Sequence, residues 1–222
     1  MAGISLNSAF GIPHETLGLR KLSARWVPKA LREEQLVRHV NLSRDLLTKI
    51  EANETRFFDR IVTRDETWIY QYDPESKIQS KQWLPRGSAG PVKFKAERSA
   101  RKVMATIFWD SDGVILTDFL EGERTVTTSY YKAVLRKLNT ALARKRCGKL
   151  HFGVLFHHDN APAHSSRTVR TVLREFLWEV IPHPPYSPDV APSDFLLFPK
   201  LKEHFKGTLF ESTDDARRAV ST

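Results

Sequence analysis

Three aspartates in this chain are placed where carboxylates could hold divalent cations. Asp159 follows a short apolar run in the block HHDNAPAH, and Asp194 closes the block YSPDVAPSD, with 34 residues between the two. Asp65 lies in VTRDETW, a run that is typical of a strand. Three carboxylates from distant parts of a chain can hold two divalent cations about 4 Å apart, which is the apparatus for in-line attack on a phosphodiester. Hard cations such as Mg²⁺ prefer these oxygen ligands.

Positive charge gathers in two windows of the sequence. Residues 81–102 hold seven Lys or Arg against one acid, and residues 124–150 hold eight against none, in a chain whose net charge is +9. Ordinary solvated surface would explain either window alone. Together, and beside a carboxylate cluster, they indicate a track for the phosphates of nucleic acid. The cations that we expect to contact DNA are Lys93, Lys95, Arg98, Arg101, Lys102, Lys132 and Arg136.

Length and composition favour a globular protein that does not enter a membrane. With 222 residues, 41% of them hydrophobic, the chain can form one sizeable domain with a small appendage. No apolar stretch approaches the roughly 20 residues that span a bilayer, and the first residues lack the pattern of a secretory signal. Cys147 is the only cysteine, so we expect no disulfide framework and an intracellular setting.

Apolar periodicity predicts alternating helices and strands. A helix over 31–50 precedes a strand over 60–72, and Asp65 projects from one face of that strand. The next elements are a hairpin over 103–119 with its turn at Asp112-Gly113, and a helix capped by Thr127 or Thr128 that runs to about Arg146. A strand over 152–156, a helix over 165–177 and a strand over 178–181 follow. The last predicted helix bears Phe198, Leu201 and Phe205. This order favours the α/β class: a ribonuclease-H-like mixed sheet flanked by helices, with an N-terminal linker and helix segment.

Two of these helices raise further expectations. The helix that begins near Thr128 is predicted to be cationic and amphipathic, with Lys132 and Arg136 opposite an inward apolar stripe. The stripe consists of Tyr131, Leu135, Leu138 and Leu142. In the last helix, Pro199 conflicts with an unbroken helix starting at Asp194. Either the helix kinks at this proline, or it begins near the proline and Asp194 lies in the turn before it.

Each aspartate also has a purely structural explanation. Asp194 could be a charge at a helix N-terminus, Asp159 could cap a turn, and Asp65 could pair with a nearby arginine. All three explanations must hold together for the metal site to fail. Glu66 should point to the opposite strand face from Asp65, so we do not take it as a ligand, and Asp189 is set aside as well.

The histidines of the HHDNAPAH block invite a zinc interpretation. His157, His158 and His164 are clustered, but no cysteine is near and a fourth ligand is missing, so zinc is not favoured. We expect His164 to pack or to hydrogen-bond beside the active site. Trp83, within the first basic window, could be a core residue or could contact DNA.

These motifs together resemble the catalytic part of mariner-type transposases of the Tc1/mariner superfamily. Residues 158–164 resemble the family's HDNAPxH block, and residues 186–194 resemble its YSPDLAPSD block, with Val190 where leucine is common. The 34-residue spacing matches that of the family's aspartate triad. VTRDE resembles the first-aspartate block, and WVPKAL at residues 26–31 resembles the linker motif WVPHxL.

The resemblance implies a metal-dependent DNA transposase. It implies cleavage of double-stranded DNA at transposon ends and joining of the freed 3′ hydroxyl to target DNA. The implied cofactors are two Mg²⁺ or Mn²⁺ ions, and the implied location of the protein is the nucleus. Carried over by position, Asp65, Asp159 and Asp194 would be the catalytic residues and metal ligands, with Asp65 bridging both ions. A homodimer would form through the linker residues Trp26, Val27 and Pro28, and a loop at about 86–102 would help clamp DNA or the partner.

The chain departs from the family pattern in three respects. Arg64 stands where the family usually has glycine, so its bulky cation could displace Asp65 or compete with the metal. We expect residues 1–30 to be a remnant of the helix-turn-helix region and linker. We expect residues 31–222 to be a ribonuclease-H-like catalytic domain that stops before the family's last helices. An alternative function follows: a catalytically impaired or captured fragment that acts only as a DNA-binding or dimerising module.

Overall fold

The computed structural model describes residues 5–20, 22, 29–52, 56–121 and 125–221. It divides into two compact units, residues 1–31 and residues 32–222, and each is described by itself. In the first unit, helix α1 (Leu6–Gly11) leads into the π-helical turn η1 (Ile12–Thr16). The predicted linker residues Trp26, Val27 and Pro28 lie outside the described residues.

The second unit is built on a mixed five-stranded sheet. Its strands are β1 (Ile61–Tyr70), β2 (Lys102–Asp110), β3 (Gly113–Phe119), β4 (Leu155–His157) and β5 (Glu179–Ile181). Their order in the sheet is β3-β2-β1-β4-β5, in which β1 pairs antiparallel with β2 and parallel with β4. The predicted hairpin therefore forms one half of the sheet, and the short parallel strands form the other.

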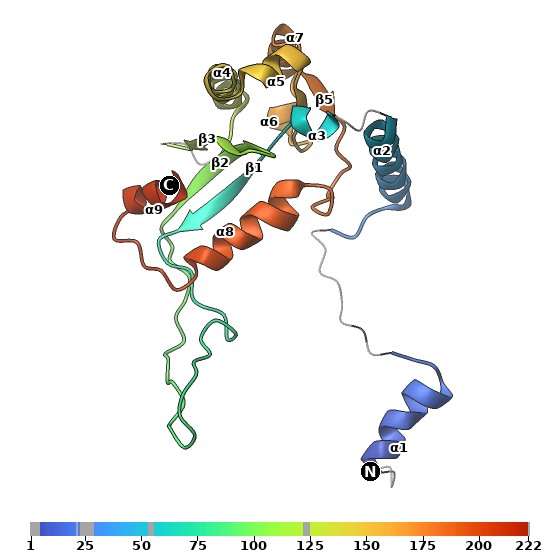
Figure 1. The fold of residues 1–222 in the computed structure, drawn as a ribbon, viewed down its shortest axis with the longest axis vertical. Coiled ribbons are helices and arrows are strands. Elements are labelled where there is room, and N and C mark those ends of the chain that lie inside the picture. Colours follow the sequence, from blue (N-terminus) through green and yellow to red (C-terminus); the bar gives the residue numbers. More distant parts are fainter. Residues whose placement is uncertain (1–4, 21, 23–28, 53–55, 122–124, 222) are drawn as a thin grey trace. The chain divides into compact units, whose positions relative to one another are not determined.

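Helices cover both faces of this sheet, as Figure 1 shows. One face carries α4 (Thr128–Lys145), α5 (Cys147–Phe152), α6 (Pro162–Ser165) and α7 (Arg167–Glu175), and the other carries α8 (Phe198–Phe205) and α9 (Thr213–Ser221). Each face has its own hydrophobic core. Val62 and Phe108 belong to the core under α4 and α7, while Ile69 and Ile107 belong to the core under α8. Alternate strand residues thus serve opposite cores, as the pleat requires.

Helix α4 confirms the predicted cap and stripe. Thr127 is its N-cap, and the side chain of Thr127 accepts a hydrogen bond from the backbone N–H of Tyr130. The predicted stripe residues Tyr131, Leu135, Leu138 and Leu142 are all buried. Burial of this apolar face fixes the helix against the sheet, because helical stability in proteins comes mainly from such packing.

The segment after the YSPDVAPSD block shows how the chain accommodates Pro199. Residues 193–197 form the π-helical turn η2 (Ser193–Leu197), and α8 begins at Phe198. Pro199 therefore stands in the first turn of α8, where a missing N–H costs no helical hydrogen bond. Of the two predicted alternatives, the second holds: Asp194 lies in the turn before the helix.

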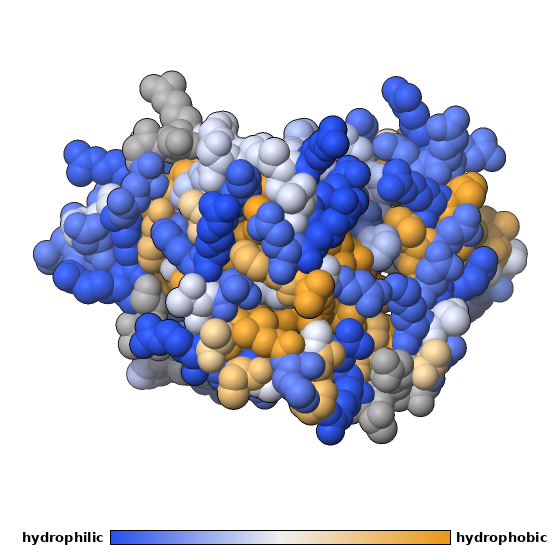
Figure 2. Space-filling view, turned by 90° about the horizontal axis from the view of Figure 1, so that it is seen from above, coloured by the Kyte–Doolittle hydropathy of each residue, from blue (hydrophilic) through white to orange (hydrophobic). Residues whose placement is uncertain are grey.

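Helix α2 (Glu33–Ala52) forms as predicted but leaves much of its apolar pattern exposed. Leu36, Val40 and Leu47 are about half exposed, whereas Ile50 packs against the small core around Phe57. Hydrophobic residues also gather between hydrophilic ones on the face seen from above in Figure 2. Among the described helices, none combines the length and apolar character needed to cross a membrane. The short helix α3 (Phe57–Arg60) connects this region to β1.

Candidate active site

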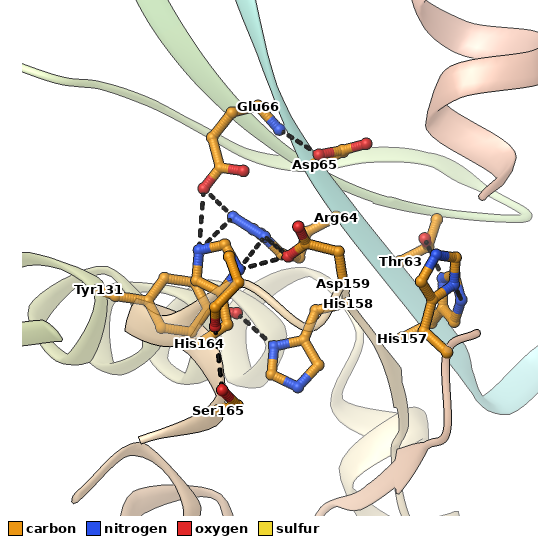
Figure 3. Close-up of polar contacts among 12 residues, drawn as sticks. Thr63, Arg64, Asp65, Glu66, Tyr131, His157, His158, Asp159, His164 and Ser165 are labelled. Carbon is orange, nitrogen blue, oxygen red and sulfur yellow. Dashed lines mark hydrogen bonds and ion pairs between the residues drawn. The ribbon is translucent and has the colours of Figure 1, made fainter. Parts of the chain in front are cut away.

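Strand β1 carries Asp65 on one face of the sheet and Arg64 on the other. Asp65 pairs across the ladder with Ile107, which belongs to the core under α8. Its neighbour Arg64 pairs with Phe108, which belongs to the core under α4. Because side chains alternate, Glu66 shares the face of Arg64. Figure 3 shows Asp65 apart from the cluster that surrounds Arg64 and Asp159.

Asp65 meets Asp194 on the α8 face. The negative charge of Asp194 acts on Asp65 and disfavours its ionised form. Burial, and after it the charges of Asp194 and Asp159, raises the pKa of Asp65 to about 7, against the lowering effect of Arg64. Burial also raises the pKa of Asp194. The two carboxyls therefore behave as a crowded acidic pair.

Two contacts fix the turn that carries Asp194. The indole N–H of Trp109 on β2 donates to the hydroxyl of Ser193, at a nitrogen–oxygen distance of 3.0 Å. The backbone N–H of Asp194 donates to the carbonyl of Ala191 at 2.9 Å. The π-helical turn is thereby tied to the sheet immediately beside the carboxylate.

Asp159 follows β4 and is held from the α4 face. Its Oδ1 lies 2.5 Å from Nδ1 of His164 and 3.5 Å from Nη1 of Arg64. Burial would raise the pKa of Asp159, but the hydrogen bond from His164 and the charge of Arg64 outweigh it and hold that pKa well below its usual range. Asp159 is therefore ionised at neutral pH, whereas Asp65 is only about half ionised.

His164 links this carboxylate to the neighbouring groups. Burial lowers the pKa of His164, which favours the neutral ring. In the tautomer that best fits its neighbours, Nδ1–H donates to Asp159 and Nε2 accepts from Nη2 of Arg64 at 3.1 Å. The expectation that His164 hydrogen-bonds beside the site is confirmed. Tyr131 lies beneath this group, with its hydroxyl 3.0 Å from Nδ1 of His158.

The preceding histidines brace the loop that carries Asp159. His157 Nδ1 lies 3.1 Å from the hydroxyl of Thr63, and its Nε2 lies 3.1 Å from Nδ1 of His183. Burial, helped by His183, lowers the pKa of His157 to about 4, so the ring is neutral at pH 7. The side-chain amide of Asn160 donates to the carbonyl of His183 at 2.5 Å. These histidines therefore support the backbone around Asp159.

A cavity of about 380 Å³ opens beside Asp159. Its lining includes Asp159, Asn160 and His164, together with Arg170 and Arg174 of α7. The two arginines would attract a negatively charged group to this cavity.

The carboxylate oxygens of the three aspartates are ligands that hard divalent cations prefer. The positions of these oxygens, however, match a metal site only in part. Asp65 and Asp194 are adjacent, and Asp159 is close enough to raise the pKa of both. One oxygen of Asp159, however, is engaged by His164 and Arg64. In the part of the chain that the structure describes, no three His, Cys, Asp or Glu side chains are grouped so that they could hold a metal ion.

The predicted DNA-contacting cations fall into two separate places. The long connection between β1 and β2 projects beyond α8 (Figure 1). It contains Lys93, Lys95 and Arg98, and Arg101 and Lys102 lie at its end. Here Lys102 lies over the ring of Trp68 at 4.1 Å, and Arg98 pairs with Asp73 at 2.9 Å. Lys132 and Arg136 lie on α4, which covers the other face of the sheet.

Two residues contribute more to the site than the sequence indicated. Glu66, set aside as a ligand, forms an ion pair with Arg64 and lies 3.2 Å from Nε2 of His164. Tyr131, expected only in the apolar stripe, has its ring 4.9 Å from the Arg64 guanidinium carbon. The two-residue period of the strand already put Glu66 on the face of Arg64, and that signal could have revealed the pair.

Comparison with known proteins identifies the family. Residues 73–152 match the family described as Transposase (partial DDE domain). The chain is 38% identical over 196 residues to the Mariner Mos1 transposase of Drosophila mauritiana, a match that covers 87% of this chain and 55% of that protein. The crystal structure of the Mos1 catalytic domain matches with a TM-score of 0.70 and 34% identity, over 88% of this chain and 83% of that one. The chain belongs to the mariner transposase family.

The same comparison confirms the predicted ribonuclease-H-like fold class. Structures of the mariner Mos1 paired-end complex, one with Mn and one with Mg, also match with a TM-score of 0.80 and 35% identity. These matches cover 96% of this chain and 62% and 61% of the Mos1 chains. The present chain thus spans little more than half the length of the Mos1 transposase.

Proposed function

We propose that this chain is a DNA transposase core that cleaves DNA strands and joins the freed 3′ hydroxyl to target DNA. The observation that supports the proposal is electrostatic: the charges of Asp194 and Asp159 act on Asp65, although the three residues come from β1, the end of β4 and the turn before α8. Membership of the mariner family supports it. Transposon ends and target DNA are the proposed partners, and the nucleus is the proposed location.

In this proposal Asp65, Asp159 and Asp194 would hold two divalent cations, Mg²⁺ or Mn²⁺. When bound, such cations lower the pKa of an attacking water and stabilise the leaving oxygen. The protein's own contribution is positioning. His164 and the loop around His157 orient Asp159, and the Trp109–Ser193 contact orients the turn of Asp194.

The protein would also set the protonation state of the Asp65 carboxyl group. At pH 7 Asp65 is close to half protonated, since its pKa is about 7. A cation that neutralises the repulsion between Asp65 and Asp194 would release this proton. We therefore expect metal binding to release protons and to weaken as pH falls through 7.

The phosphate track of the proposal has two parts. Arg170 and Arg174 line the cavity beside Asp159, and the cations of residues 93–102 lie on the projecting β1–β2 connection. We propose that both contact the DNA backbone, and that a homodimer forms through Trp26, Val27 and Pro28 to bridge two DNA ends.

Nicking of a supercoiled plasmid in Mn²⁺ tests the catalytic proposal. Asp159→Asn should abolish metal-dependent nicking, because it removes one carboxylate with little change in volume. Asp189→Asn is the matched control, since Asp189 precedes Asp194 by five residues and instead faces His39 at 3.6 Å. Equal nicking by the wild type and Asp159→Asn would contradict the proposal.

A second candidate function is a non-catalytic DNA-binding or dimerising module. The observation in its favour is that Arg64 engages Asp159 inside the acidic site. This version predicts salt-sensitive DNA binding without cleavage at any Mn²⁺ concentration. A plasmid that is bound but never nicked by the wild type would favour it.

A further inference from the structure

Arg64 is a buried cation beside Asp159, on the face of β1 opposite Asp65. Its side chain has no solvent exposure, and its guanidinium contacts groups on three sides. Nη2 pairs with Glu66, Nη1 lies 3.5 Å from Asp159, and the planar group lies over the ring of Tyr131. Figure 3 shows the guanidinium between Glu66 and Asp159.

The pairing of this guanidinium is incomplete. Its Nε is buried without a hydrogen-bond partner among the described residues. Its two Nη atoms are shared between two carboxylates and the ring of His164, so no bidentate pair with a single carboxylate forms. A buried arginine is held most firmly by a bidentate, fully paired arrangement, which this site does not supply.

A divalent cation and Arg64 would compete for the same carboxylate. The cation needs the oxygens of Asp159, and one of these already faces both Nη1 of Arg64 and the ring of His164. A fixed positive charge a few ångströms from a divalent cation also repels it strongly in a site shielded from water. Both effects act in the same direction and weaken metal binding.

We propose that Arg64 is a built-in counter-cation that holds Asp159 and sets a low affinity of the site for divalent metal. This inference rests on the proposed function, because it assumes that the three aspartates are the ligands. Arg64 acts as a positioning residue through Asp159. Its removal should therefore tighten metal binding rather than abolish it, which separates this role from that of a ligand.

Removal of Arg64 alone would leave the partly buried Glu66 without its arginine partner, so the test uses a charge-balanced pair of substitutions. The double variant Arg64→Met/Glu66→Gln keeps side chains of similar length and removes one charge of each sign. Arg64→Lys keeps the charge and loses the planar fork. Arg98→Met is the control, because Arg98 is an exposed arginine that pairs with Asp73 outside the acidic site.

The affinity of the metal-stripped proteins for Mn²⁺ is measured by the loss of the free-ion signal in electron paramagnetic resonance. We expect the double variant to bind about tenfold more tightly than the wild type, or better, and Arg64→Lys and Arg98→Met to bind within about threefold of it. The rise in melting temperature on adding Mn²⁺ should be larger for the double variant than for the wild type. Asp159→Asn added to the double variant should remove the gain.

Two results would overturn the inference and can be told apart. Equal Mn²⁺ affinity of the wild type and the double variant, with binding still dependent on Asp159, would overturn the role of Arg64 and leave the proposed function standing. Absence of Mn²⁺ binding by every folded variant, at concentrations up to the millimolar range, would overturn the inference together with the proposed metal site.

Discussion

Replacement of Asp65 by asparagine should stabilise the metal-free protein at alkaline pH. Burial and the neighbouring carboxylates raise the pKa of Asp65 from 3.8 to about 7, so the folded protein holds this proton more tightly than the unfolded chain does. Between these two values the folded state binds more protons, and the free energy of unfolding therefore falls as pH rises. Above pH 7 the Asp65 carboxyl is mostly ionised, and the free energy of unfolding is then lowered by nearly the full amount.

The magnitude follows from the size of the shift. Each unit is worth about 1.36 kcal/mol, so a shift from 3.8 to about 7 corresponds to about 4 kcal/mol at pH 8. At pH 5 part of this cost is already present, and the difference between pH 5 and pH 8 is about 3 kcal/mol. Asparagine cannot ionise, so the Asp65→Asn variant should lack this part of the pH dependence.

Urea unfolding, followed by tryptophan fluorescence in EDTA at pH 5 and pH 8, measures the effect. The wild type should lose about 3 kcal/mol more of its free energy of unfolding between these pH values than Asp65→Asn does. Asp45→Asn, at an exposed position of α2, is the control and should follow the wild type. If Asp65→Asn has the same pH slope as the wild type, the carboxyl of Asp65 is not the buried, crowded group described above.

Three further predictions concern the core, a helix cap and the DNA track. Leu138→Ala should lower the free energy of unfolding by about 2–5 kcal/mol, because this side chain is fully buried. In the same urea experiment, Leu36→Ala on the exposed side of α2 should lower it by roughly 0.5 kcal/mol or less. Thr127→Ala should cost about 1 kcal/mol through loss of the cap on α4, and Thr127→Ser should retain most of it. If Lys95 and Arg101 contact phosphates, replacing both with glutamine should reduce the slope of log affinity against log salt by about 0.9 for each, and an unchanged slope would exclude them from the track.

Several features of the fold could be predicted because they depend on local patterns. The stripe around Leu138 has helical spacing, the Asp112-Gly113 turn suits a hairpin, and Thr127 is a preferred N-cap residue. Short parallel strands are harder to delimit. The apolar run at 152–156 predicts a strand throughout, but Phe152 ends α5 and β4 begins at Leu155. A buried run of a few apolar residues satisfies either element, and the contacts of the tertiary structure decide between them.

The sequence by itself determined which side chains could do chemistry, because blocks of residue types and their spacing are properties of the chain. It also determined that Arg64 and Glu66 share a strand face opposite Asp65, because the pleat alternates. Only the tertiary structure decided that Arg64 reaches Asp159, about a hundred residues away along the chain, and that His164 joins them. The physical reason is that the parallel pairing of β1 with β4 brings these residues together, and such long-range pairing depends on the burial of both sheet faces rather than on any local signal.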